Sequence, residues 1–294
     1  MSNSYIKSPI NWVGNKFKHL NIINDLIKDK KYSFVLDMFL GSGNVLLNLQ
    51  CNSDKYIGND KNKLVPMLYG ELKKYTYNLD KFEEIINRFN RFSDKSDYYT
   101  FRDYWNKKYL SNIFDEEFIY ETVMLLKMCS NSMVRFNPKE GYFNQGFRGI
   151  SATKKNNEFF TDTMKSLCVD GLNELSKHLN KNDYRFMSKD FITYEDKWNN
   201  GLLICDPPYI LRKDMYDTDF SENHDVKLLD IISNTKNDFI YFNYLVSNGE
   251  VNETLNKIIK ENNYKVMDIN NKSLAGQGRS QNIKEVQEVI VTNV

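Results

Sequence analysis

The chain has 294 residues, a formal net charge of +1 and an apolar fraction of 41%. This length suits one large domain, or a domain that carries a substantial insertion. The near-neutral charge excludes a protein that is basic throughout, so a nucleic-acid partner would require a local basic patch. No apolar run approaches the roughly 18 residues of a membrane span, and residues 1–11 lack a secretory apolar core.

Cysteines and histidines are dispersed. The four cysteines form no CxxC pair, and the three histidines stand far from one another. We therefore expect neither a metal site nor a disulfide framework, and we expect reduced thiols in a cytoplasmic protein.

The segment SFVLDMFLGSGNVLLNLQ (33–50) predicts a strand, a tight glycine loop and a helix. Asp37 ends the strand, and Gly41 and Gly43 follow. A second short strand, in DKYIGNDKNKL, ends at Asp60. Because an acid at this place in an open α/β sheet commonly holds a ribose diol, the pattern suits a nucleoside-containing cofactor. A glycine loop alone is also typical of a plain strand–helix turn, and neither a GxxxxGK[ST] loop nor a full GxGxxG motif is present.

The middle of the chain, about 62–155, has a different character. Apolar residues at helical spacing predict helices in DKFEEIINRFNRF, DYYTFRDYWNKKYL and FIYETVMLLKMCSNSM. The stretch VRFNPKEGYFNQGFRGISATKK then breaks into Gly, Asn, Pro and aromatic residues, which predicts a hairpin or a long loop. We expect a mostly helical insertion here.

Short apolar runs separated by helical stretches recur late in the chain, at 184–191, 201–209, 238–246, 264–270 and 286–294. Strands that alternate with helices predict an α/β fold with a mainly parallel sheet covered on both faces.

The run at 201–209 ends in Asp206, Pro207, Pro208 and Tyr209. Each proline fixes φ at about −65° and removes an N–H group, so the Pro207 carbonyl and the Asp206 carboxylate form two rigid acceptors. An exocyclic NH2 group has two matching donors. Held in this way, a poorly nucleophilic adenine N6 can turn pyramidal and attack a methyl sulfonium placed in line. Tyr209 offers a face for stacking on a base that has left the duplex.

A Pro-Pro turn after a strand is the plain alternative for this motif. Its combination with the glycine loop and the acid-ended second strand favours the catalytic interpretation.

These segments together resemble the Dam-type family of DNA adenine-N6 methyltransferases, whose motifs run in the order FxGxG, recognition region, DPPY. NWVGNKFKHL (11–20) resembles a WxGxK motif, and DMFLGSGNVLLNL resembles the FxGxG motif. YIGND, SKDF (188–191), DPPY and EVQEVIVTNV resemble further motifs of the family in their usual order.

The resemblance implies a Rossmann-like S-adenosylmethionine-dependent methyltransferase sheet with an inserted, mostly helical target-recognition domain. The catalytic domain would be discontinuous, comprising 1–61 and 156–294, with recognition by 62–155 and a DNA-reading hairpin at about 131–149. The four DPPY residues would be catalytic. The expected contacts to S-adenosylmethionine, with no metal, are Trp12, Lys16, Asp37, Phe39, Gly41, Gly43, Asp60, Asp190 and Phe191.

The insertion carries the DNA-reading part of the resemblance. YYTFRDYWN (98–106) resembles the pattern YYxFRxxFN, and VRFNPKEGYFNQGFRG (134–149) resembles a hairpin RxNxxxxFNxPxGR. Arg135 would then contact a guanine through two donors. Residues 127–155 hold six basic residues and one acid, a local charge of +5 that suits phosphate. The expected DNA contacts are Asn11, Arg135, Asn137, Asn144, Arg148 and Tyr216.

Two departures affect the expected target. Asn11 stands where relatives that read GATC often have Lys, and FNQGFRG lacks the usual FNxPxGR ending, with Arg148 displaced by one. We therefore expect GATC or a related short site. Tyr216 and Phe220, in the polar segment after DPPY, are expected either to contact DNA or to anchor that segment.

The expected activity is site-specific methylation of a flipped-out adenine in double-stranded DNA by a monomer. The resemblance allows a cognate restriction endonuclease that shares the site. Methylation of RNA adenine or of cytosine N4 stays open as an alternative, as does a DNA-binding module without catalytic activity.

Overall fold

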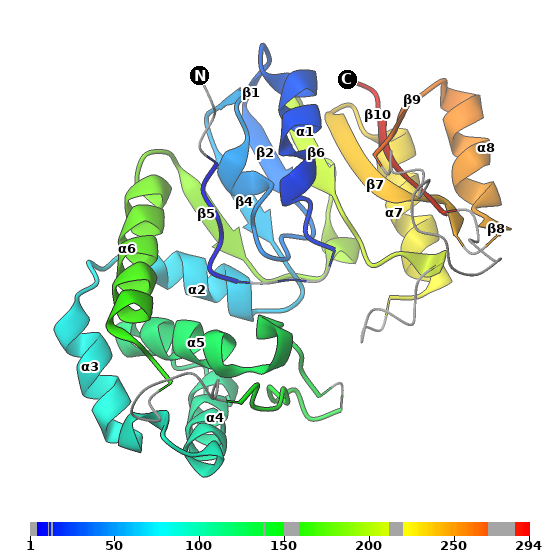
Figure 1. Cartoon of the computed structure of the whole chain (residues 1–294). Coiled ribbons are helices and arrows are strands. Elements are labelled where there is room, and N and C mark those ends of the chain that lie inside the picture. Colours follow the sequence, from blue (N-terminus) through cyan, green and yellow to red (C-terminus); the bar gives the residue numbers. More distant parts are fainter. Residues whose placement is uncertain are drawn as a thin grey trace, which may run out of the picture. The chain divides into compact units, whose positions relative to one another are not determined.

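The computed structural model describes residues 5–10, 12, 14–137, 139–149, 159–211, 220–247, 249–269 and 286–294. The chain divides into two compact units (Figure 1). Unit 1 contains Met1–Asn15, Gly41–Asn48 and Asn62–Ser188, and unit 2 contains Lys16–Leu40, Leu49–Lys61 and Lys189–Val294. The domain boundaries expected at 61/62 and 155/156 stay a prediction.

Unit 2 is built on a sheet in which β4, β2, β6 and β7 lie side by side and run parallel. Strand β10 pairs antiparallel with β7 and with β9, and β8 pairs antiparallel with β7. A short parallel pair, β1 (Lys31–Tyr32) and β3 (Asn52–Ser53), lies apart from it. The strands of the sheet are β2 (Phe34–Asp37), β4 (Tyr56–Asn59), β6 (Gly201–Cys205), β7 (Asp238–Ser247), β8 (Glu250–Val251), β9 (Lys265–Asp268) and β10 (Val286–Thr292). The predicted α/β class with a mainly parallel sheet is confirmed.

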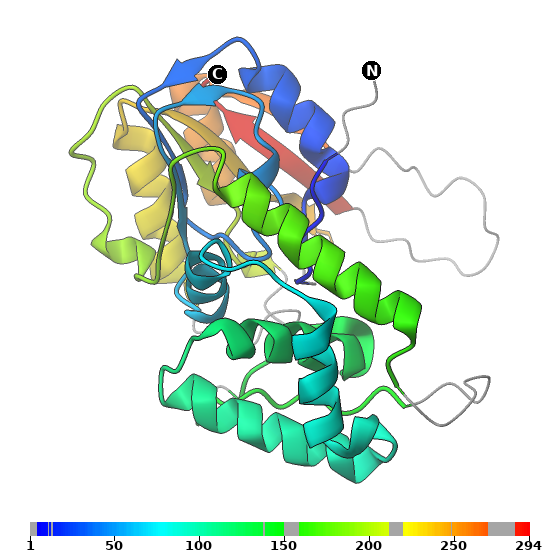
Figure 2. The ribbon, with the colours of Figure 1, turned by 90° about the vertical axis from the view of Figure 1, so that its left-hand side faces the viewer.

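The central strands are apolar because both of their faces are covered. Every residue of β2, β4 and β6 is buried, as expected for parallel strands between two layers of helices. Helix α1 (Leu20–Ile27) lies on one side of the sheet and α7 (Glu222–Asn234) on the other (Figure 2). Helix α8 (Glu253–Asn262) packs on α7 and β7. Gly201 is required at the start of β6, because a Cβ atom there would clash with the ring of Phe34.

The prediction of a helix after the glycine loop is wrong. The structure has a single 3-10 turn there, η2 (Leu46–Asn48). Asn44 Oδ1 accepts the Ser8 N–H at 2.9 Å, and Asn48 bonds both the N–H and the C=O of Ile6, at 2.7 and 2.8 Å. Because these asparagine side chains bind the N-terminal segment, they compete with a regular helix.

Unit 1 is mostly helical. The helices predicted in the middle of the chain are confirmed as α3, α4 and α5, while α2 and α6 were not anticipated as separate elements. The elements of this unit are α2 (Leu64–Leu72), α3 (Leu79–Arg88), α4 (Lys95–Leu110), α5 (Glu116–Met128), α6 (Asp162–Leu179) and β5 (Tyr184–Met187). No helix in the described part of the chain is both long and apolar enough to cross a membrane.

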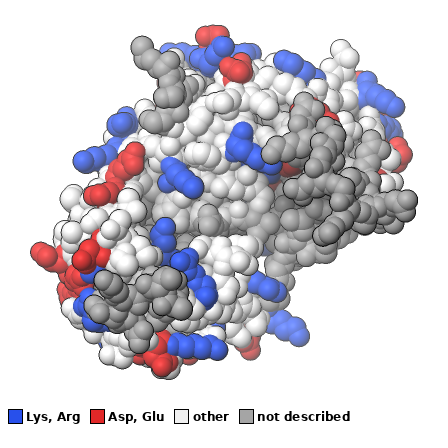
Figure 3. All heavy atoms as spheres, in the orientation of Figure 1, with Lys and Arg blue, Asp and Glu red and all other residues white. Residues whose placement is uncertain are grey.

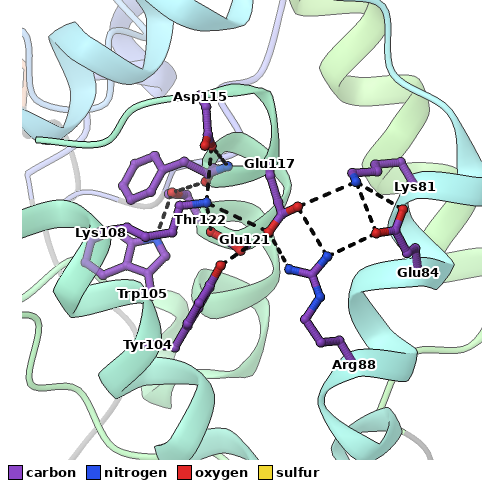
Figure 4. Close-up of polar contacts among 11 residues, drawn as sticks. Lys81, Glu84, Arg88, Tyr104, Trp105, Lys108, Asp115, Glu117, Glu121 and Thr122 are labelled. Carbon is purple, nitrogen blue, oxygen red and sulfur yellow. Dashed lines mark hydrogen bonds and ion pairs between the residues drawn. The ribbon is translucent and has the colours of Figure 1, made fainter.

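The interface between α4 and α5 combines an aromatic core with a buried ion-pair network. Trp105 of α4 is fully buried, and its Nε1–H donates to Thr122 Oγ1 of α5 at 2.9 Å. Figure 4 shows Lys108 of α4 beside Glu121 and Glu117 of α5, with Glu117 reaching Arg88 of α3. The Lys108 ammonium lies 2.9 Å from Glu121 Oε2, and Glu121 has no exposed surface. A charge buried this deeply destabilises a fold strongly when it loses its partner.

Candidate active site and DNA-reading hairpin

Three adjacent parallel strands of unit 2 end in acids. Asp37 closes β2, in register with Gly58 of β4 and Ile204 of β6, and Asp60 and Asp206 follow those two neighbours. Because the carboxyl ends of parallel strands meet at one edge of a sheet, the three acids gather at the edge where open α/β folds bind their ligands.

Asp206 lies in a group of charged and polar side chains of unit 2. The Lys16 ammonium lies 2.8 Å from its Oδ1 and 2.9 Å from its Oδ2, and the Tyr209 hydroxyl donates to Oδ1 at 2.9 Å. Lys16 is only 3% exposed, so this cation is committed to the interior of unit 2. Glu288 of β10 completes the group, with its Oε1 3.1 Å from the Tyr209 hydroxyl and 3.6 Å from the Lys16 ammonium.

The remaining hydrogen-bonding capacity of Asp206 is that of an acceptor. A carboxylate has about four lone-pair positions. Among the described residues, Lys16 donates to Oδ2 and contacts Oδ1 as an ion pair, and Tyr209 donates to Oδ1. One position on Oδ2 is left, and the side chain keeps 21% of its surface exposed. An N–H donor that approaches from outside can therefore still bind.

Burial and neighbouring charges set the proton affinity of this group. Burial is the largest cause that raises the pKa of Asp206 above its ordinary value, and the charge of Glu288 adds to it. Lys16 and the Tyr209 hydroxyl lower the same pKa. Burial and the charge of Asp206 raise the pKa of Asp37 well above its ordinary value. Unit 2 therefore holds acids at this edge that protonate more readily than exposed ones.

The Tyr209 side chain is only 2% exposed, and its ring packs edge-on against Tyr244 with centroids 4.9 Å apart. Its hydroxyl thus has a structural partner in Asp206, while stacking of the ring on a base stays a prediction. The two prolines join Asp206 to Tyr209, and Pro207 is buried while Pro208 is half-buried.

The segment around Asp190 is fixed by a side chain that the sequence did not single out. Asn59, at the end of β4, donates to the carbonyls of Met38 and Lys189 at 3.1 and 3.0 Å and accepts the Lys189 N–H at 3.0 Å. Asp190 then caps the short turn after it, and its Oδ2 lies 3.1 Å from the Lys61 ammonium.

An aromatic surface adjoins this acid within unit 2. The rings of Phe39 and Phe191 lie 5.0 Å apart, and Phe220 packs on both at 6.2 and 5.9 Å. Phe220 also stacks on His224. The contacts of Phe220 observed here are therefore those of a residue that anchors its segment to unit 2.

Trp12, Gly41 and Gly43 belong to unit 1. Gly41 has φ +50° and Gly43 φ +75°, backbone conformations that favour glycine. A Cβ atom on Gly41 would lie 3.2 Å from Cδ1 of Trp12, so the absence of a side chain also admits the indole. The structure brings these two predicted residues together.

The hairpin of unit 1 is held by antiparallel bridges between Phe136 and Phe143 and between Cys129 and Phe147. Arg135 and Arg148 are exposed, and Arg148 lies over the ring of Phe159 at 5.2 Å. Figure 3 shows basic side chains at the surface of this region.

The two predicted asparagines of the hairpin differ in their contacts. Asn137 Oδ1 accepts the N–H groups of Lys139 and Glu140, at 2.9 and 3.0 Å, and so shapes the turn. Asn144 Oδ1 is buried without a hydrogen-bond partner among the described residues. Asn11 and Tyr216 lie outside the described residues.

Helix α4 anchors the hairpin through side chains in the segment that resembles YYxFRxxFN. Asn106 donates to the Phe143 carbonyl at 3.0 Å and accepts the Phe143 N–H at 2.7 Å. The Tyr98 hydroxyl donates to the Gln145 carbonyl at 2.8 Å. A buried side chain that satisfies both backbone groups of one residue fixes the position of the segment that carries this residue.

Sequence reasoning missed Glu288, Asn59 and Asn106 as contributors to these arrangements. Each lies inside a segment that matched the family, EVQEVIVTNV, YIGND and YYTFRDYWN, so the signal was present at the level of the motif. Their hydrogen-bond partners stand 21 and 130 residues away for Asn59, 37 for Asn106 and 79 for Glu288, and only the fold reveals them.

Comparison with known proteins agrees with this geometry. The chain is 29% identical to the type II methyltransferase M.FokI of Planomicrobium okeanokoites over 99% of its length, and 27% identical to the modification methylase StsI of Streptococcus sanguinis over 98%. It spans 43% of the length of each relative. A family model, D12 class N6 adenine-specific DNA methyltransferase, matches residues 12–273. Since that match covers nearly the whole chain, the protein belongs to the D12 class of N6 adenine-specific DNA methyltransferases.

Proposed function

We propose that the protein transfers a methyl group from S-adenosylmethionine to N6 of a flipped-out adenine in double-stranded DNA, within GATC or a related short site. The observation that carries this proposal is the arrangement at Asp206. A half-buried carboxylate is held by Lys16 and Tyr209 and keeps 21% of its side-chain surface exposed, which leaves an acceptor position for a ligand. That position suits one N–H of an exocyclic amine, and the Pro207 carbonyl is the acceptor proposed for the other.

Residues of unit 2 have the chemistry to hold the methyl donor. Asp60 is a half-buried acid at a strand end, which suits a ribose diol. The paired rings of Phe39 and Phe191, with Asp190 beside them, suit the flat face and the amine of an adenine. When bound, S-adenosylmethionine supplies an electrophilic methyl group. Among the described residues, no group of three His, Cys, Asp or Glu side chains gathers to hold a metal ion.

The residues around Asp206 orient the attacking amine. Two fixed acceptors hold the N6 hydrogens, which leaves the nitrogen lone pair free to point at the methyl carbon. Because Lys16 and Tyr209 already fix the carboxylate, little reorganisation is needed when the amine arrives. As the new N–CH3 bond forms and the S–CH3 bond breaks, one N6 proton must leave, and Asp206 is the acid group nearest to it in this arrangement.

The hairpin supplies the proposed DNA contacts. Arg135 is exposed and carries a planar guanidinium that can bond guanine O6 and N7 together. Helix α4 fixes the strand opposite it through Asn106. We further propose that the protein acts as a monomer in the cytoplasm, and that a restriction endonuclease which cuts the same site accompanies it.

The test is methyl transfer from labelled S-adenosylmethionine to unmethylated genomic DNA, with the product nucleosides identified and the modified positions mapped by sequencing. N6-methyladenine confined to GATC would support both the chemistry and the target. N6-methyladenine at another short site would keep the chemistry and exclude GATC. Label in N4-methylcytosine or in RNA alone, or in neither nucleic acid, would overturn the proposal.

A further inference from the structure

Glu288 stands at an irregularity of the sheet. Strand β10 pairs with β7 in a regular antiparallel register except for a shift between Gln287 and Glu288, where Glu288 falls opposite Tyr244. The register skips Leu245, so the extra residue lies on β7 and changes which β7 residue faces Glu288, and bulges are common next to active sites. Glu288, on β10 opposite this bulge, is a carboxylate with only 8% of its residue surface exposed.

The Glu288 carboxylate reaches the same two side chains that grip Asp206. Its Oε1 lies 3.1 Å from the Tyr209 hydroxyl, which lies 2.9 Å from Asp206 Oδ1. It also lies 3.6 Å from the Lys16 ammonium. A phenol has one O–H hydrogen, so Tyr209 can donate to one of the two carboxylates at a time.

We propose that Glu288 is a positioning residue that shares the hydrogens of Lys16 and Tyr209 with Asp206 and thereby prepares Asp206 to take the proton released by N6. The inference rests on the proposed function. With Asp206 ionised, the Tyr209 hydrogen lies on Asp206 Oδ1. Once the N6 proton has moved to Asp206 Oδ2, Oδ1 becomes the carbonyl oxygen of a neutral acid and a weaker acceptor, so the Tyr209 hydrogen turns to the Glu288 carboxylate.

Charge favours the same sequence. Lys16 brings one positive charge, and Asp206 and Glu288 bring two negative ones, so the buried group carries −1 before the reaction. Uptake of one proton by Asp206 makes it neutral, and a neutral group is cheaper to bury. Once the methylated base has left the site, the exposed part of Asp206 allows the proton to leave to water.

Titratable groups on the surrounding elements also interact electrostatically with Asp206 and Glu288. The neighbours that interact electrostatically with Asp206 or with Glu288 come from β2, β6 and the turn before α1, and they are Asp37, Cys205 and His19. Burial raises the pKa of Cys205 and lowers that of His19, so both stay neutral near neutral pH. Glu288 is thus the nearby anion whose removal changes the charge of the group while leaving the acids of the cofactor side intact.

The experiment compares wild type with Glu288→Gln, an amide of the same shape. The carboxyl 13C shift of Asp206, assigned through its loss in Asp206→Asn, is titrated in the protein without DNA or methyl donor. The pH profile of single-turnover methyl transfer is measured in parallel. Glu261→Gln, an exposed carboxylate of α8 with a lysine partner 3.8 Å away, is the matched control.

Because Glu288 raises the pKa of Asp206, its removal should lower the titration midpoint of the Asp206 carboxyl. The acid limb of the rate profile should move in the same direction. At neutral pH, kcat should fall roughly tenfold, because the charged acceptor that Glu288 offers to Lys16 and Tyr209 is removed from the reacting site. KM for DNA should stay within about twofold, because Glu288 is not expected to contact DNA. An unchanged midpoint in Glu288→Gln, as in the control, would show that Glu288 is merely structural.

A second variant decides the matter if Glu288→Gln does not fold. Tyr209→Phe removes the donor that lowers the pKa of Asp206, so the midpoint should move upward, and an unmoved midpoint would overturn the proposal. The titration needs no catalysis. If wild type methylates no DNA, the proposed function fails, and the midpoints still decide whether Glu288 acts on Asp206.

Discussion

The buried Glu121 in unit 1 gives a sharp prediction about stability. Burial is the main cause that raises the pKa of Glu121 to about 7, against the partial compensation of Lys108. In an unfolded chain the same group has an ordinary pKa of about 4.5. An acid with a raised pKa favours folding most when it is protonated. Its contribution is therefore present at low pH and is lost as pH rises from about 4.5 through about 7.

The magnitude follows from those two values. Between about pH 5.5 and about pH 8, protonation linkage lowers the free energy of unfolding by about 2 kcal/mol. Glu121→Gln keeps the shape and removes the titration. The difference in unfolding free energy between wild type and Glu121→Gln should therefore fall by about 2 kcal/mol over this range, because other titrating groups cancel in the difference.

Urea unfolding followed by tryptophan fluorescence at the two pH values measures this difference. Trp105 packs beside the network through its bond to Thr122 and reports on unit 1. Glu84→Gln, an exposed partner of Arg88 on the rim of the same network, should leave the pH dependence as in wild type. Equal pH dependence in wild type and Glu121→Gln would refute the reasoning, since the buried carboxylate would then titrate as an exposed one does.

Three further predictions concern the site and the hairpin. Asn106→Ala should cost about 2 kcal/mol of stability by leaving the N–H and C=O of Phe143 unpaired, and should raise KM for DNA while cofactor affinity, measured by calorimetry, stays unchanged. Asp37→Asn should gain stability relative to wild type as pH rises, because burial raises the pKa of Asp37; equal differences in chemical denaturation at about pH 5.5 and about pH 8 would contradict this. Lys16→Met should raise the pKa of Asp206 and move the acid limb of kcat/KM to higher pH, and a limb that stays in place would exclude that coupling.

The acids at the sheet edge were accessible to sequence reasoning because each follows a buried apolar run. Runs such as FVLD and GLLICD predict a strand that is covered on both faces and that ends at an acid. In a parallel sheet those ends share an edge, so the gathering of Asp37, Asp60 and Asp206 follows from local patterns and one rule of topology.

Other features depend on side chains that meet across the fold. The glycine loop predicted a following helix, and only the bonds from Asn44 and Asn48 to residues 6 and 8 explain why a single turn forms there. The sequence pattern predicts only that Glu288 lies in the last strand, and the irregular pairing beside it appears only in the structure. Asn106 was part of a matched motif, yet its role required the position of Phe143.

The proposed function places methyl transfer to adenine in DNA at Asp206. The most direct measurement compares wild type with Asp206→Ala for transfer of labelled methyl groups to unmethylated DNA, with binding to the same DNA measured alongside. We expect N6-methyladenine from wild type, and a variant that binds DNA with similar affinity but transfers no methyl group. A wild type that binds DNA without ever methylating it, or an Asp206→Ala variant that methylates as wild type does, would show that Asp206 does not catalyse methyl transfer to DNA.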